Sequence, residues 1–437
     1  MTLYHHIPLP RQRPRIWRSQ GQKLAFVLIA VLTVTLWAPA ITSPGESAFN
    51  LSIFVAVAVG ISLLFTQGFM RPPVASAADG RSIIIITFCM ISLAFLSLLS
   101  ITYAEQPFRV FRVAAGQAFG FAILYGILNL PQTPAAAKRI VNLLIWCATI
   151  SGGYAVLAYV YPPVGAIAFG TSDRTAAFFK HANQFGMALS LTMPLLAAAC
   201  INDQWKLKRL VQLGLIVLGV IFSGSKTNMA LSLAGFMVVV VAGAFIGGTL
   251  HKRPGVVILS LVAAAIAVAV APLILVELNP RAYRLISATA SGETIHSMND
   301  RLAVWDHSIR VGLAQPLTGA GAGQMVGVGT MPHSHNVFIE YLRTLGFPGL
   351  ILITLFIVTV LGLCLRELRS ALLLRSRSAE SRVLGFALVV SIFSYLAANQ
   401  LSDSFGPSTL PLFWTSLALL LFWRSIHKNG KGNFRRS

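Results

Sequence analysis

Long apolar runs recur along almost the whole chain, separated by short polar segments. Many of them hold about 20 residues, the length that an α-helix needs to cross the hydrocarbon core of a bilayer. The runs are continuous and do not alternate, so the pattern predicts helices that satisfy their own backbone hydrogen bonds in lipid. We predict twelve membrane spans, at residues 24–41, 49–66, 82–102, 110–130, 140–161, 184–201, 210–222, 227–247, 255–276, 345–365, 383–400 and 409–423.

The composition favours lipid as the main solvent. The chain is 56% hydrophobic and 11% charged, with a mean hydropathy of +0.74, whereas soluble globular chains carry about 25% charged residues. We therefore predict an all-α polytopic membrane protein. Its predicted parts are an N-terminal segment at 1–23, spans one to nine within 24–276, a large loop at 277–344, spans ten to twelve within 345–423, and a basic tail at 424–437.

The basic residues predict the orientation. Most of the 34 Lys and Arg residues fall in every second loop, beginning with the N-terminal segment. The positive-inside rule therefore places both termini in the cytoplasm and the large loop on the periplasmic side of an inner membrane. The formal net charge of +21 does not predict nucleic-acid binding, because these residues are dispersed among short loops beside anionic lipid headgroups.

Two other classes of site find no support in the sequence. The four cysteines, Cys89, Cys147, Cys200 and Cys364, fall in or at the ends of predicted spans without metal-site spacing, so neither a disulfide nor a metal site is expected. We find no inverted internal repeat and no charged residue in the middle of a span, which weighs against an ion pump.

Four polar groups of residues fall in the predicted periplasmic loops and carry the candidate chemistry. They are 174–183 with Arg174, His181 and Asn183; 223–227 with Lys226; 301–321 with Arg301, Trp305 and a glycine-rich turn; and 333–343 with His333, His335, Asn336, Glu340 and Arg343. Each has an ordinary alternative explanation. The two candidate arginines could pair with neighbouring aspartates or reach headgroups, the lysine could anchor a span end, and the histidine could be an ordinary loop residue.

The fourth group can be given a geometry. If Asn336 begins a helix that runs into the tenth span, Asn336, Glu340 and Arg343 share one face at i, i+4 and i+7. His335 would then lie at the mouth of this face, where an imidazole can accept a proton near neutral pH. Earlier in the same loop, we expect Asp300 to cap a helix that follows it.

The order and spacing of the four groups resemble the O-antigen ligase and polymerase superfamily, most closely the exopolysaccharide polymerases of the ExoQ type. The matching segments are 174–183, 225–227, 301–305 with 316–321, and 333–336. Lys226 stands where an arginine is common, which replaces a bidentate fork with a point charge. Lys180 and His181 stand where a His-Pro or similar pair is usual. The resemblance implies a GT-C-like fold.

The resemblance also implies a metal-independent, cofactor-free glycosyltransferase that takes an undecaprenyl-diphosphate-linked glycan as donor on the periplasmic side. Arg174, Lys226 and Arg301 would bind the diphosphate leaving group. His335 would deprotonate the acceptor hydroxyl, with inversion at the anomeric carbon, and Glu340 would orient or replace it. The expected supporting residues are His333, Asn336, Asn183, His181, Arg343 and Trp305.

The acceptor stays open at this point. A polymerase would join lipid-linked repeat units, whereas a ligase would move the finished glycan onto lipid A-core. A flippase or other transporter is a third hypothesis, but candidate charges at the span mouths favour a transferase. The expected partners are the lipid-linked oligosaccharide, membrane lipids, and a chain-length regulator and flippase of the same pathway; nucleic acid is not expected.

Overall fold

The computed structural model describes residues 77–130, 133–161, 170–171, 174–179, 181–247, 296–327, 333–373, 377–400 and 409–433, with residues 27, 30, 31, 34 and 37 of the first predicted span. The helices in this part of the chain are α4 (Ala77–Leu99), η1 (Ser100–Thr102), α5 (Pro107–Leu128), α6 (Pro134–Val160), α8 (Ala182–Asn202), α9 (Leu207–Ser223), α10 (Lys226–Gly247), α14 (His296–Ala314), α15 (Val337–Leu373), α16 (Ala379–Ala398) and α17 (Leu410–Asn433). The strands β1 (Gly170–Thr171) and β2 (Arg174–Thr175) pair antiparallel.

The described part of the chain is mostly helical, as predicted. Seven of its helices are long and apolar enough to cross a membrane: α4, α5, α6, α8, α10, α15 and α16. Helices α9 and α17 coincide with the seventh and twelfth predicted spans. The predicted spans at 49–66 and 255–276, and most of the span at 24–41, lie outside the described residues.

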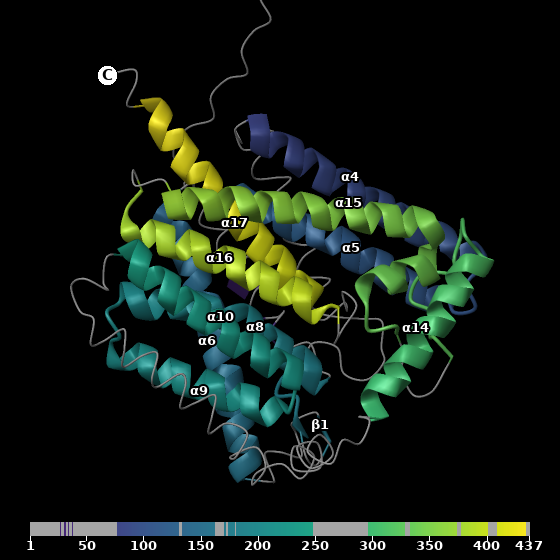
Figure 1. The fold of residues 1–437 in the computed structure, drawn as a ribbon, viewed down its shortest axis with the longest axis horizontal. Helices are drawn as coiled ribbons and strands as arrows, with labels where there is room; N and C mark the ends of the chain where they lie inside the picture. Colours follow the sequence, from purple (N-terminus) through teal and green to yellow (C-terminus); the bar gives the residue numbers. More distant parts are fainter. Residues whose placement is uncertain are drawn as a thin grey trace, which may run out of the picture.

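Helix α8 lies at the centre of the bundle. It packs against α9, α10 and α16, and most of its side chains are buried. Figure 1 shows α4, α5 and α15 on one side of α16, with α8, α9 and α10 on the other. Small residues allow close approach: a Cβ at Gly152 of α6 would lie 2.3 Å from the Leu215 carbonyl oxygen of α9. Such contacts are typical of helix packing in membranes.

Helix α15 begins earlier than the predicted tenth span and bends where that span was expected to start. Gly346 has φ +66° and ψ −160°, in a region that glycine adopts without a steric penalty. A Cβ here would lie 2.4 Å from the Pro316 carbonyl oxygen. The same carbonyl accepts a hydrogen bond from the Phe347 backbone N–H at 2.7 Å. The bend therefore fixes the glycine-rich turn against α15.

Two local predictions for the segments between the spans need correction. Asp300 does not cap a helix, because α14 begins four residues earlier at His296. The residues directly before Asp300 already belong to α14. The second correction is the β1–β2 hairpin, which the all-α prediction did not include. This hairpin is short, and it places Arg174 beside the beginning of α8.

A buried ion network joins helices at the end of the bundle opposite α14. Arg424 of α17 contacts Asp79 of α4 at 2.9 Å and Glu367 of α15 at 3.0 Å, and Arg377 contacts Glu367 at 2.6 Å. All four side chains are less than one-tenth exposed. Removing one partner of a buried pair leaves an uncompensated charge, which costs more than the pair itself contributes.

We therefore expect Arg424→Met to lower the free energy of unfolding by about 3–5 kcal/mol, because Asp79 and Glu367 would stay buried without it. Thermal unfolding in detergent micelles measures the effect. The matched control is Lys138→Met, which removes a half-exposed ion pair with Glu380 and should cost at most about 1 kcal/mol. Equal melting temperatures for the two variants would contradict a structural role for the network.

Candidate functional site

Arg174 joins two of the sequence groups. Its Nε donates to the Ser223 carbonyl oxygen at 2.9 Å, and its Nη2 donates to Asn183 Oδ1 at 2.5 Å. Ser223 ends α9, so the guanidinium satisfies a helix-terminal carbonyl. The 174–183 and 223–227 groups are therefore in contact.

Asn228 ties the same groups together from α10. Its Nδ2 donates to the Asn183 carbonyl oxygen at 3.1 Å and to Ser225 Oγ at 2.8 Å. Its Oδ1 is buried without a hydrogen-bond partner among the described residues. The sequence analysis missed Asn228, although a polar residue one turn after Ser225 at the start of an apolar span was a usable signal. We name Arg174, Asn183, Ser223, Ser225 and Asn228 the arginine cluster.

Lys226 and His181 lie at the border of the arginine cluster. Lys226 is the first residue of α10 and is exposed, while His181 precedes α8 as its N-cap residue and is also exposed. Both helices therefore begin at this cluster with their positive ends toward it. A helix N-terminus together with a lysine favours an anionic group. Lys180 lies outside the described residues.

A second cluster forms where α14 meets the start of α15. Trp305 Nε1 donates to the Ser334 carbonyl oxygen at 2.6 Å, and the Ser334 backbone N–H donates to Glu340 Oε2 at 2.9 Å. Glu340 Oε1 accepts from Arg343 Nη2 at 2.7 Å. Arg343 is fully buried. With His333 and His335, these residues form what we name the histidine cluster.

The two histidines lie side by side above this ion pair. Their ring centroids are 4.4 Å apart. His335 has φ +54°, a left-handed conformation that is uncommon outside glycine, asparagine and aspartate. Asn336 then caps α15, because its Oδ1 accepts from the backbone N–H groups of Phe338 and Ile339. The predicted helix start at Asn336 and the shared face of Glu340 and Arg343 are therefore confirmed.

The two clusters lie at the same end of the bundle. In Figure 1, α14 and the first turns of α15 are on the right, and the hairpin, labelled β1, is at the bottom and nearer the middle. The arginine cluster lies at the end of α9 and the starts of α8 and α10, while the histidine cluster lies at the start of α15.

Residues 211–354 match a family model described as O-antigen ligase. This segment, which is less than half of the chain, is similar to the O-antigen ligase family. No curated protein matches the sequence. The match supports the superfamily that the motifs resemble, without a distinction between its polymerases and ligases. It includes most of α9, all of α10 and α14, and the start of α15. The matched segment, residues 211–354, therefore contains Lys226, Arg301 and the histidine cluster, while Arg174 and Asn183 lie before it.

Arg301 stands out within the matched segment because it is half-buried and its Nε has no hydrogen-bond partner among the described residues. Burial lowers the pKa of its guanidinium from the ordinary value, although arginine stays charged in proteins. The suggested pairing with Asp306 is wrong, because Asp306 pairs with Arg310 on the exposed side of α14. A buried N–H group on a cation can bind an anionic ligand.

The glycine-rich turn contacts the histidine cluster through Arg343. Arg343 Nη2 donates to the Gln324 carbonyl oxygen at 2.7 Å. The Gln324 side chain accepts from the Gln106 backbone N–H at 3.0 Å, and the Ala322 backbone N–H donates to Ser100 Oγ at 3.0 Å. The turn therefore links α15 to the α4–α5 connection. The sequence analysis missed Gln324, because contacts made through backbone atoms leave no residue signature.

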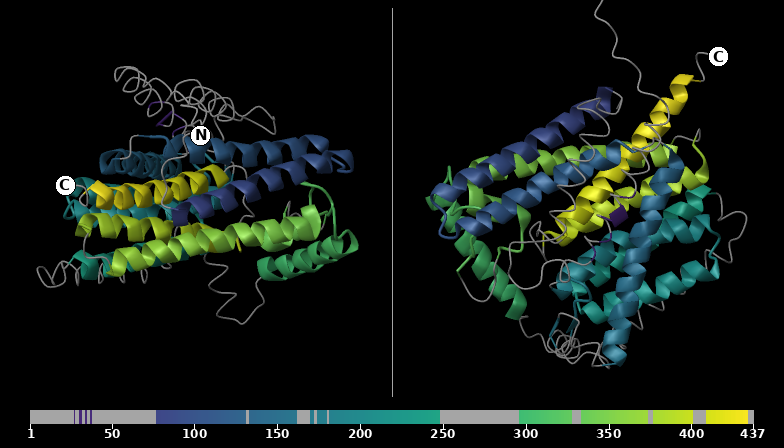
Figure 2. Two further views of the ribbon diagram at one scale, coloured as in Figure 1. Left: turned by 90° about the horizontal axis from the view of Figure 1, so that it is seen from above. Right: turned by 180° about the vertical axis from the view of Figure 1, so that it is seen from behind.

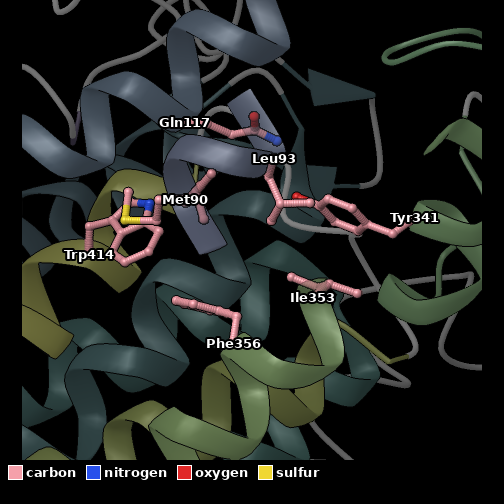
Figure 3. A pocket seen from close by; sticks show the side chains of 8 residues that line it. Met90, Leu93, Gln117, Tyr341, Ile353, Phe356 and Trp414 are labelled. Carbon is pink, nitrogen blue, oxygen red and sulfur yellow. The ribbon is translucent and has the colours of Figure 1, made fainter. Parts of the chain in front are cut away.

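A small cavity lies deeper in the bundle, on the other side of the α15 start (Figure 3). Tyr341, next to Glu340, points into it together with Gln117 of α5 and Trp414 of α17. Gln117 Nε2 and Trp414 Nε1 are buried without hydrogen-bond partners among the described residues. The remaining lining is apolar: Met90, Leu93, Ile353, Phe356 and Leu410. No charged side chain lines this cavity, so it does not suit a diphosphate.

Proposed function

We propose that this chain polymerises a surface or secreted polysaccharide, by transferring a glycan from an undecaprenyl-diphosphate donor at the periplasmic face of the inner membrane. The observation that carries this proposal is that the arginine cluster with the adjacent Lys226, and the imidazole-bearing histidine cluster, both lie at the end of the bundle where α10 and α15 begin. The O-antigen ligase match supports this reaction class for an integral membrane protein.

The proposed reaction is one displacement at the anomeric carbon of the donor sugar. The acceptor hydroxyl oxygen forms the new glycosidic bond as the bond between the anomeric carbon and the phosphate oxygen breaks. His335 takes the hydroxyl proton, and the lipid diphosphate leaves with the bonding electrons. A single displacement inverts the anomeric configuration. Because the leaving group is already a weak base, cationic donors stabilise it more effectively than a general acid would.

Each candidate residue has its own proposed role in the reaction. Arg174, Lys226 and Arg301 bind the diphosphate, with Asn183 and His181 at the edge of the arginine cluster. His335 is the base. Glu340 is bonded to Arg343 and to the Ser334 backbone, which favours a positioning role for Glu340 over a direct proton transfer. Trp305, His333 and Asn336 hold the loop that carries His335.

The polymerase and ligase hypotheses differ in the acceptor, and a deletion strain separates them. We expect loss of the chain to leave single repeat units on the lipid carrier. Long glycan chains that stay on the carrier would instead identify a ligase acting on lipid A-core. A normal glycan profile with no lipid-linked intermediate would contradict both, and would favour transport or another role. A chain-length regulator and flippase of the same pathway are the expected partners.

In the proposed mechanism the diphosphate is bound by Arg174, Lys226 and Arg301, which we call the cationic clamp, and no divalent metal is needed. We therefore expect the purified chain in nanodiscs to polymerise lipid-linked repeat units at an unchanged rate after treatment with excess chelator. The control is a metal-dependent sugar transferase in the same buffer, which should lose its activity. Loss of polymerisation that magnesium or manganese restores would contradict the metal-free mechanism.

A further inference from the structure

Helix α14 has an inner face that packs on the rest of the protein. Val304, Ser308 and Gly312 on this face are buried. Gly312 packs against Leu342 of α15, where an added Cβ would lie 2.6 Å from the Leu342 Cγ. Arg301 and Trp305 belong to the same side of the helix, three or four residues before Val304 and Ser308 in the helical repeat. The inner face therefore serves the candidate site.

The outer face of α14 is a stripe of large apolar residues. Leu302, Ile309 and Leu313 lie at i, i+7 and i+11, which places them in one line along the helix. They are between 38% and 56% exposed. Asp306, at i+4 from Leu302, lies at the edge of this line and forms an exposed ion pair with Arg310 one turn later. The helix thus has three sides, one packed on protein, one apolar and exposed, and one polar.

Other segments near this end of the bundle also expose apolar residues. Leu317 and Met325 of the glycine-rich turn are 75% and 50% exposed, and Leu99 at the end of α4 is 48% exposed. The Tyr103 hydroxyl donates to the Thr318 carbonyl oxygen at 2.8 Å, which holds this turn beside the α4–α5 connection. The exposed apolar residues of the turn therefore lie near the end of α4.

The placement of α14 differs from that of the spans. It is not among the helices apolar enough to cross a membrane. It crosses α15 steeply at the level of that helix's first turns (Figures 1 and 2). A helix with one apolar stripe and one charged side, inclined to the spans at this level, has the features of a helix that lies in the lipid–water interface.

We propose that α14 is an interfacial helix whose stripe Leu302, Ile309 and Leu313 lies among the lipids of the adjacent leaflet. Its occupant is the membrane surface. Because Arg301 is on the packed side of the same helix, about 100° around the helix axis from Leu302, the depth of the stripe sets the height of Arg301 relative to the lipid phosphates. This consequence rests on the proposed function, since the donor's diphosphate would lie at that height; the interfacial placement does not.

The placement is tested by spin labels in nanodiscs of phosphatidylethanolamine and phosphatidylglycerol. The full chain carries one new cysteine at a time, at Ile309 or Leu313 on the stripe and at Ala303 or Arg310 as matched exposed controls. The four native cysteines are buried and are replaced by alanine if they react. We expect oxygen to reach the stripe labels better than a nickel chelate does, and the opposite order at the controls.

Two outcomes would overturn the proposal. Equal nickel access at all four positions would place the stripe in water. Exclusion of both reagents from Ile309 and Leu313 would show that a second copy of the chain covers it. Neither outcome depends on catalysis, so the proposed transferase function could survive the failure of this placement.

A kinetic readout tests the consequence for the donor. Leu313→Glu should raise the KM for the membrane-embedded donor on the order of tenfold with kcat unchanged, because a carboxylate is expelled from the interface. A water-soluble donor with a short lipid tail should be used equally by Leu313→Glu and the unaltered chain. Ala303→Glu, which adds the same charge on the polar side, should change neither. An unchanged KM in Leu313→Glu would contradict the link between stripe depth and donor binding.

Discussion

Replacement of His335 should abolish polymer formation in a chain that still folds and inserts. A general base contributes about a hundred- to ten-thousand-fold to such a step, and the left-handed backbone of His335 turns the loop immediately before α15. His335→Ala would strain this backbone as well as remove the imidazole. His335→Asn is the sharper variant, because asparagine tolerates the left-handed region but cannot accept the proton as a base.

The measurement is polymer yield from purified variants in nanodiscs, with thermal unfolding as the check on folding. We expect His335→Asn to melt at the temperature of the unaltered chain and to form no detectable polymer. His333→Asn is the control, since its ring lies 4.4 Å from His335 and has a supporting role, so it should reduce the rate only in part. Normal polymer length from His335→Asn would remove this residue from the reaction.

Loss of either clamp arginine should weaken use of the donor. A hydrogen bond to a charged group contributes about 1.5–3 kcal/mol, so Arg301→Ala and Arg174→Ala should each lower kcat/KM roughly ten- to a hundredfold. The two residues differ in their structural roles. Arg174 also bonds Ser223 and Asn183, so its loss should lower the melting temperature. Arg301 has an unpartnered Nε among the described residues, so its loss should leave stability nearly unchanged.

The controls for this experiment lie on the same elements. Arg310→Ala removes an arginine from the exposed side of α14 and should leave kcat/KM unchanged. Arg174→Lys keeps the charge without the bidentate fork and should retain part of the activity. Full donor use by both alanine variants would end the clamp hypothesis, because the remaining candidate cation, Lys226, would then suffice.

Much of the helical framework could be predicted, because continuous apolar runs report spans directly. The start of α15 was also predictable, since Asn336 is a good capping residue and Glu340 and Arg343 share its helix face. The start of α14 was not, because polar, turn-forming residues before Asp300 have weak helix propensity and tertiary packing on α15 overrides it.

The hydrogen bonds that join the site residues were less predictable than the identity of the residues themselves. Arg174 and the 223–227 segment were each identified, but their bond is to the Ser223 carbonyl, which any residue would supply. The same holds for Trp305, which donates to the Ser334 carbonyl, and for Arg343, which donates to the Gln324 carbonyl. Sequence motifs therefore identify candidate side chains, while the backbone that joins them emerges only from the fold.

The central claim is that the arginine cluster and the histidine cluster serve one donor. A cryo-electron microscopy structure of the chain in nanodiscs with an undecaprenyl-diphosphate-linked repeat unit tests it most directly. We expect the diphosphate within hydrogen-bonding distance of both Arg174 and Arg301, with the anomeric carbon facing His335. A diphosphate bound elsewhere, or one that contacts a single arginine with His335 turned away from the sugar, would contradict the account.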